Sequence, residues 1–203
     1  MKPLLTLFAT ALLASTAHAK EADIYIVAGQ SNGWRLSAIG PGPGPETKAI
    51  HYFGMGCATR PDAPTYTFIE RLHPGVSGAG LASALLERSQ KEIVFIQYCV
   101  CGSSLNDAIN WYPGDDPANG ETNDDGLYGS FTRYLSEVRR QVEALGIEWK
   151  VDGLFWHQGE ADVKIDPERH RRNLANLFLR FRKDLGADLP IVAGHIRDLD
   201  QGS

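Results

Sequence analysis

The sequence predicts one α/β domain built on a parallel five-stranded sheet that helices cover on both faces. Apolar runs of strand length alternate along the chain with segments of helical periodicity. The runs are apolar on both faces, which is typical of strands buried between two layers of helices. Right-handed crossovers bring the carboxyl ends of such strands to one edge of the sheet, where these sheets bind their ligands.

The expected strands are short apolar runs bounded by turn-forming residues. The second has mixed polarity, which indicates a position nearer the edge of the sheet. We expect strands at residues 23–28, 48–53, 93–100, 151–156 and 189–193.

Three helices are indicated by apolar residues three and four positions apart. We expect them at residues 77–89, 131–145 and 167–185, bounded by the capping or stop residues Ser77, Gly146, Asp166 and Gly186. The basic residues of the third helix lie off its apolar stripe and are expected on a solvated face: Arg171, Arg172, Arg180, Arg182 and Lys183. Residues 111–125 are rich in Pro, Gly, Asn and Asp and are expected to be irregular.

Residues 1–19 have the pattern of a secretory signal peptide. A basic start precedes an apolar stretch at residues 4–13, and residues 17–19 form an Ala-x-Ala cleavage site. The apolar stretch is well short of the roughly 20 residues of a membrane-spanning helix. We therefore expect cleavage after Ala19, export to the periplasm or the medium, and one compact domain in residues 20–203.

The composition argues against several classes of partner. The net charge is −5 and the basic residues are scattered, so we expect no nucleic-acid partner and, after signal cleavage, no membrane partner. The three cysteines Cys57, Cys99 and Cys101 leave at least one thiol unpaired. Cys99 and Cys101 share a strand face and do not pair readily, so a Cys57–Cys101 disulfide and three free thiols both stay open. The oligomeric state is also left open.

A serine follows the first strand in the sequence GQSN, residues 29–32. Gly29 permits a sharp turn, which would expose the Ser31 hydroxyl at the edge of the sheet. The plain alternative is a serine that caps the next helix. After the third strand, Gly102 would leave its amide open to a developing oxyanion, and Ser103 and Ser104 compete with Ser31 for the role of nucleophile.

Polar residues also follow the fourth strand, in the sequence HQGEAD, residues 157–162. Gln158 can donate from its carboxamide, and Glu160 can orient an imidazolium. A metal site formed by His157, Glu160 and Asp162 is the alternative, but these residues share a turn rather than helical i, i+4 spacing. We therefore expect neither a metal nor a cofactor.

Taken together, the sequences GQSN (29–32), GSSL (102–105) and WHQGEAD (156–162) resemble the leading motifs of one branch of the SGNH hydrolases. This is the sialate O-acetylesterase-like branch, which includes the acetylxylan esterases of carbohydrate esterase family six. The resemblance covers nearly all of residues 20–203. It implies a three-layer α/β/α sandwich of flavodoxin-like type and an enzyme that removes O-acetyl groups from sialic acid, xylan or other glycans.

The resemblance also implies roles for individual residues. These are Ser31 as nucleophile, the Ser31 and Gly102 amides and the Gln158 side chain as the oxyanion hole, Glu160 as the carboxylate that assists a catalytic histidine, and Asn32 and His157 as supporting residues. The chain departs from the family at Gly33, where methionine is usual, and at Cys101, where glycine is usual. Both departures bear on the shape of the crevice.

The family's general base, a histidine in an Asp-x-x-His block after the fifth strand, is not found in residues 195–203. In a 2-1-3-4-5 strand order, with strands ~4.8 Å apart, the fifth strand lies ~14 Å from the first. His195 is then a poor substitute, and His157 is expected about two strand spacings from the first strand.

Our leading hypothesis is a secreted serine esterase for acetylated carbohydrates, in a chain that lacks its C-terminal catalytic segment or is inactive. A non-catalytic carbohydrate-binding protein on the same fold is the alternative, with Trp34, Trp111 and Tyr112 stacking on sugar rings. A third hypothesis is a metal-dependent hydrolase. The sequence leaves open which sugar is deacetylated.

Overall fold

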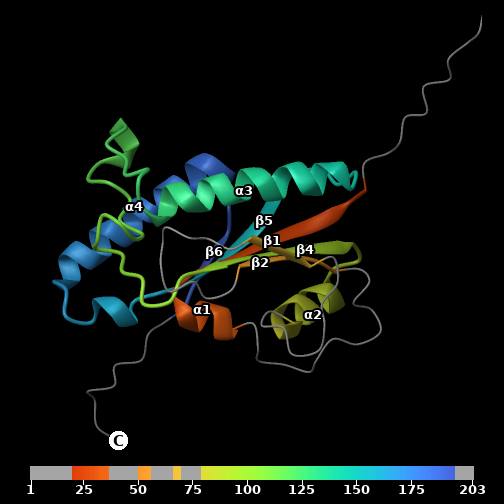
Figure 1. The fold of residues 1–203 in the computed structure, drawn as a ribbon, viewed down its shortest axis with the longest axis horizontal. Coiled ribbons are helices and arrows are strands. Elements are labelled where there is room, and N and C mark those ends of the chain that lie inside the picture. Colours follow the sequence, from red (N-terminus) through yellow and green to blue (C-terminus); the bar gives the residue numbers. More distant parts are fainter. Residues whose placement is uncertain (1–19, 37–49, 56–65, 70–78, 195–203) are drawn as a thin grey trace, which may run out of the picture.

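The computed structural model describes residues 20–36, 50–55, 66–69 and 79–194. Within these residues the chain forms a three-layer α/β/α sandwich (Figure 1). Helices α3 (Leu127–Ala144) and α4 (Pro167–Leu185) cover one face of the sheet, and α1 (Ser31–Leu36) and α2 (Ala79–Arg88) cover the other. The expected fold class is confirmed. The expected signal peptide and the expected cap Ser77 lie outside the described residues.

The sheet has the strand order β3-β2-β4-β1-β5-β6. The bounds are β1 Ala22–Gly29, β2 Ile50–Met55, β3 Tyr66–Ile69, β4 Glu92–Cys99, β5 Val151–His157 and β6 Ile191–Ala193. The five predicted strands are all present, and they form a continuous parallel sheet. The sequence did not predict β3, which pairs antiparallel with β2.

The expected 2-1-3-4-5 strand order is wrong. In chain order of the five parallel strands, the first strand, β1, lies between the third, β4, and the fourth, β5. The 2-1-3-4-5 order is that of the flavodoxin-like fold type. The apolar pattern of a strand indicates that the strand is buried, but it does not indicate which strand lies beside it. As a consequence β5 and His157 lie one spacing from β1, and β6 lies two, or about 10 Å.

Helix ends follow local chemistry. Asp166 caps α4 by accepting from the Arg169 amide at 3.0 Å, with Pro167 in the first turn, as predicted. After α3 the chain leaves the helix at Gly146, whose φ of 79° favours glycine. Residues 111–125 are irregular except for a short 3-10 turn at Pro117–Asn119.

The core lies mainly between the sheet and the pair α3 and α4. Its largest members are aromatic and at most 2% exposed: Tyr98, Trp111, Tyr128, Phe131, Tyr134, Trp156 and Phe181. The rings pack edge to face, as between Trp111 and Trp156, whose centroids are 5.1 Å apart. A smaller apolar cluster on the opposite face lies under α2. Helix α4, which carries Phe181 into this core, is therefore packed firmly against the sheet.

The prediction that Arg180 lies on a solvated face is wrong. Its residue surface is 6% exposed, and its guanidinium donates to the carbonyls of Pro113 and Asn123 at 3.1 and 2.9 Å. It also pairs with Asp124 and lies 3.7 Å from the ring centroid of Tyr128. The irregular residues 111–125 present carbonyls to α4, and a long planar donor satisfies them where a shorter side chain would not reach.

Of the cysteines, Cys101 is disulfide-bonded and Cys99 is a buried free thiol. Cys57, the partner expected from the sequence, lies outside the described residues. Three free thiols, the other possibility left open by the sequence, are therefore excluded. No helix among the described residues has the length and hydrophobicity to cross a membrane.

Candidate active site

The turns that follow β1, β4 and β5 adjoin at the carboxyl edge of the sheet. The Gln30 amide donates to the His157 carbonyl at 2.8 Å, and the Val100 amide donates to the Gly29 carbonyl at 2.9 Å. Gly29 has a φ of 132°, and a Cβ built there would lie 2.1 Å from the His157 carbonyl oxygen. Only glycine allows β1 to turn this close to β5.

Ser31 begins α1, directly after this turn, and is partly exposed. Its hydroxyl makes no hydrogen bond to any residue that the structure describes. The hydroxyl therefore has no partner in the described structure, and its role as nucleophile stays a prediction. Gly102 is exposed, with a φ of 68°, and no atom lies within 4 Å of a Cβ built on it. Its amide belongs to an open turn.

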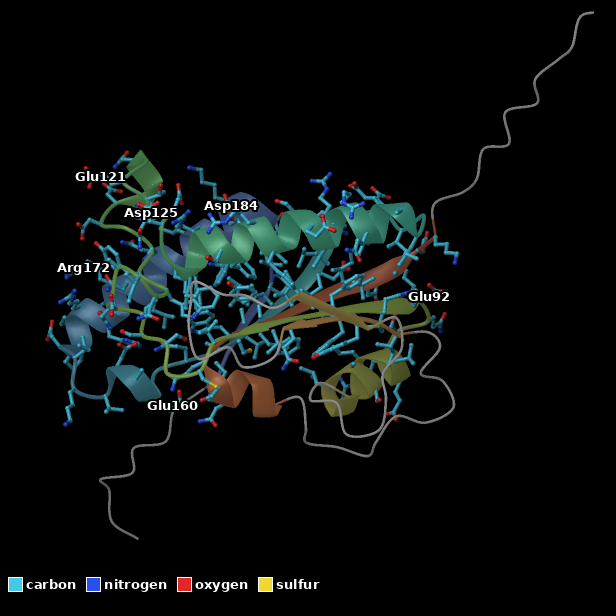
Figure 2. All side chains as sticks on the ribbon, viewed as in Figure 1. Glu92, Glu121, Asp125, Glu160, Arg172 and Asp184 are labelled. Atoms are coloured by element: carbon cyan, nitrogen blue, oxygen red, sulfur yellow. The ribbon has the colours of Figure 1, made fainter. Side chains whose placement is uncertain are left out.

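Asn32, His157 and Glu160 come together beside α1. Asn32 Nδ2 donates to Glu160 Oε1 at 2.5 Å, and His157 Nδ1 lies 3.7 Å from the same oxygen. Glu160 Oε2 and His157 Nδ1 are both buried, and neither has a hydrogen-bond partner in the described structure. Figure 2 shows Glu160 next to α1, below the carboxyl ends of the strands. One oxygen of this carboxylate therefore lacks a donor among the described residues.

Glycines lie close to His157 and Cys99. A Cβ on Gly194 would lie 2.5 Å from His157 Cδ2, so glycine there makes room for the ring, whereas a Cβ on Gly33 would lie 3.0 Å from Cys99 Sγ. Gly33 is the position where the resembling family usually has methionine. The departure noted from the sequence therefore coincides with a tight contact to another side chain, that of Cys99.

Gln158 is 4% exposed, and its carboxamide is occupied. Nε2 donates to the Ser103 carbonyl at 3.1 Å and to Asp162 Oδ2 at 2.5 Å. Both N–H groups of the carboxamide are thus used inside the protein, and one would have to be released to reach an oxyanion. The oxyanion role of Gln158 stays a prediction, as do the roles of the other residues implied by the family resemblance.

Ser103 and Ser104 are committed to structural hydrogen bonds. Ser103 is 1% exposed, and its hydroxyl donates to the Val100 carbonyl at 2.8 Å and accepts from Trp111 Nε1 at 3.0 Å. Ser104 Oγ donates to Asp162 Oδ1 at 2.5 Å. Of the three serines that the sequence offered as nucleophiles, Ser31 alone has an unoccupied hydroxyl.

Asp162 is the residue that the sequence reasoning missed, because it was weighed only as a metal ligand. Its side chain is 1% exposed, and it accepts from Ser104, from the Leu105 amide at 2.8 Å and from Gln158. Burial raises the pKa of this carboxyl, but hydrogen bonding from Ser104, Leu105, Asn106 and Gln158 outweighs burial and leaves the pKa below its ordinary value. The only sequence signal was its place in the polar turn after an apolar strand, which does not show that the carboxylate is buried.

Two alternative functions, a carbohydrate-binding protein and a metal-dependent hydrolase, depend on other residues. Trp111 is fully buried, so it is part of the core rather than a sugar platform. The Tyr112 hydroxyl pairs with Asp115, and the Trp34 side chain lies outside the described part of the structure. In the described ranges no group of three or more His, Cys, Asp or Glu side chains is arranged to hold a metal ion.

Comparison with known proteins agrees with the fold. Residues 58–203, more than half of the chain, match the family model described as carbohydrate esterase, sialic acid-specific acetylesterase. The structure of NanS is 19% identical, with a TM-score of 0.53 over 87% of this chain and 68% of that one. A carbohydrate acetylesterase from Xanthomonas citri is 15% identical, with a TM-score of 0.52 over 84% of this chain and 40% of that one. No curated protein sequence matches the chain.

Proposed function

Since the chain belongs to the sialic acid-specific acetylesterase family of carbohydrate esterases, which are carboxylic ester hydrolases, we propose that Ser31 is the nucleophile with which it removes O-acetyl groups from carbohydrates. The observation that carries the proposal is the free Ser31 hydroxyl between two bonded turns, with Ser103 and Ser104 both engaged. The matched range begins at residue 58, so the assignment of Ser31 rests on the structure and on the GQSN motif.

The reaction would follow the general course of acyl transfer. Ser31 Oγ attacks the acetyl carbonyl carbon and gives its proton to a base, and the resulting oxyanion is stabilised by the Ser31 and Gly102 amides. The tetrahedral intermediate collapses with release of the sugar hydroxyl. Water then cleaves the acetyl-enzyme to acetate and free serine.

We propose that the base is a histidine in a segment that follows Ser203. Glu160 Oε2 supports this, because it is a buried carboxylate oxygen that lacks a donor among the described residues. An imidazole N–H from such a segment would satisfy this oxygen and would be oriented by it. His157 already lies on the other side of the same carboxylate, where it supports Glu160.

The decisive experiment measures p-nitrophenyl acetate hydrolysis by the chain extended along its reading frame past Ser203. Without a base serine is a weak nucleophile, so the 203-residue chain should be slower than the extended chain by several orders of magnitude. In the extended chain, Ser31→Ala should lower kcat by at least about 10³-fold.

Ser136→Ala makes the same chemical change on the exposed surface of α3 and should leave kcat unchanged. Equal hydrolysis by the extended chain and its Ser31→Ala variant would refute the assignment. Glycan binding with no turnover by either length of chain would instead favour the carbohydrate-binding protein.

We also propose a substrate, O-acetylated sialic acid, and export of the protein from the cytoplasm. The family description supports O-acetylated sialic acid as the first substrate to assay, with acetylated xylan as the comparison. The signal-like residues 1–19 support export, and Lys20 already takes part in the fold, where its amide donates to the Gly146 carbonyl at 2.7 Å. N-terminal sequencing of the exported protein should begin at Lys20.

A further inference from the structure

Three turns meet at the carboxyl edge, and a single buried carboxylate joins two of them. Asp162 lies in the short 3-10 turn Glu160–Asp162 after β5, and its three donors include two from residues 104–105, after β4. The third donor, Gln158, holds the Ser103 carbonyl with its other N–H group. Every residue from 103 to 105 is therefore bonded to Asp162 directly or through Gln158.

The bonded residues follow Gly102 without a gap. On the other side of Gly102, Cys101 is fixed by its disulfide bond. Gly102 itself has open space around it and a backbone conformation that few other residues adopt. The direction of the Gly102 amide therefore depends on the residues on either side of it. On one side these are residues 103–105, which Asp162 holds directly or through Gln158.

We infer that Asp162 is a positioning residue, which holds the turn after β4 so that the Gly102 amide is directed at the reacting carbonyl. The inference rests on the proposed function, because it concerns the oxyanion hole that Ser31 would use. Asp162 itself touches no substrate, since its side chain is almost completely buried. Its effect on the reaction passes through Ser104 and Leu105, which it binds directly, and through Gln158, which holds Ser103.

Two substitutions of Asp162 distinguish the effect of its hydrogen bonds from the effect of its negative charge. In Asp162→Asn, the amide oxygen can take the place of Oδ2 and accept from Leu105 and Gln158. The new NH₂ group then faces Ser104 Oγ, which accepts from the Asn106 amide at 2.9 Å and has a second lone pair. Asparagine therefore keeps all three contacts without the charge, whereas Asp162→Ala loses them all.

The test compares these two variants in the extended chain with p-nitrophenyl acetate. Because a misdirected oxyanion donor costs about 10²–10³-fold in kcat, Asp162→Ala should lower kcat by about 10²-fold while KM stays within about threefold. Asp162→Asn should keep kcat within about fivefold of the parent. With the corresponding thionoester, whose sulfur is a poor acceptor, the defect of Asp162→Ala should shrink to less than about tenfold.

Asp184→Ala is the matched control, since it also removes a carboxylate that accepts a side-chain hydroxyl, that of Tyr128, at 2.7 Å. Figure 2 shows Asp184 on the opposite side of the sheet from Glu160. This variant should leave kcat unchanged. Circular dichroism should show that every variant is folded at the assay temperature.

The outcomes separate the two proposals. If Ser31→Ala abolishes turnover but folded Asp162→Ala keeps kcat within about threefold of the parent, the positioning role is wrong and the esterase assignment stands. An equal defect of Asp162→Ala on the ester and the thionoester would also overturn the positioning role. If Ser31→Ala leaves turnover unchanged, the proposed function itself has failed.

Discussion

Arg180 shows how much one side chain can organise in this protein. It donates to two carbonyls of the irregular residues 111–125, pairs with Asp124 and lies over the Tyr128 ring. Hydrogen bonds from a charged donor are each worth about 1.5–3 kcal/mol. The irregular segment 111–125, which places Trp111 in the core, is therefore held in place by the Arg180 side chain of α4.

We predict that Arg180→Lys lowers the free energy of unfolding by about 2–4 kcal/mol, because one ammonium cannot reach three acceptors held by a planar guanidinium. Urea denaturation followed by tryptophan fluorescence measures the loss. Arg171→Lys is the same exchange at an exposed position paired with Glu168, and should change the unfolding free energy by less than about 0.5 kcal/mol. Equal effects of the two variants would contradict the assigned role of Arg180.

Single residues also mark the limit of what the sequence predicts. Ser31 and Glu160 could be singled out because they follow apolar strands within specific motifs, and the structure brings Glu160 beside Asn32. The buried roles of Asp162 and Arg180 were not predicted, because the same residue types most often lie in solvent. Their burial depends on carbonyls and amides from segments about 57 residues away in the chain, and no local pattern encodes such pairings.

At the scale of elements, α4 links the core to the site. One side carries Leu177 and Phe181, both fully buried, while Leu179 on another side is 50% exposed. Its first residues follow the turn of Asp162, and Asn173 donates to the Asn106 side chain at 2.9 Å. Periodicity and caps predicted this helix well, since both signals are local. The strand order was not predicted, since it depends on contacts between distant segments.

Two substitutions on this one helix should differ sharply. Phe181→Ala removes a ring that packs against Tyr128, Phe131 and Trp156, and should cost about 3–5 kcal/mol of unfolding free energy. Leu179→Ala changes the helix at a half-exposed position and should cost less than about 1 kcal/mol. Chemical denaturation of both variants gives the comparison, and similar losses would mean that α4 does not pack as described.

At the scale of the whole molecule, stability should depend on pH through Asp162. Burial raises its pKa, but hydrogen bonding from Ser104, Leu105, Asn106 and Gln158 outweighs burial and lowers the pKa. The folded state therefore favours the ionised carboxylate. This contribution is complete above the ordinary Asp pKa of about 3.9 and is lost as the pH falls through the lower folded-state pKa.

The prediction is that the stability difference between the parent and Asp162→Asn is constant above about pH 5 and disappears in stronger acid. His170 Nδ1 lies 3.8 Å from Asp162 Oδ2, so both proteins should carry His170→Gln to leave one titrating partner. Urea denaturation at several pH values measures the difference. A difference that grows as the pH falls would contradict the assignment. Asp166→Asn, at the exposed cap of α4, provides the comparison at a solvated carboxylate.

The close contact between position 33 and Cys99 makes these two sites genetically interdependent. The side chain of a methionine introduced at residue 33 would start 3.0 Å from Cys99 Sγ, so the sulfur would have to shift by a few tenths of an ångström. Shortening residue 99 to alanine removes this sulfur, so Gly33→Met should be less destabilising in the Cys99→Ala background than in the parent.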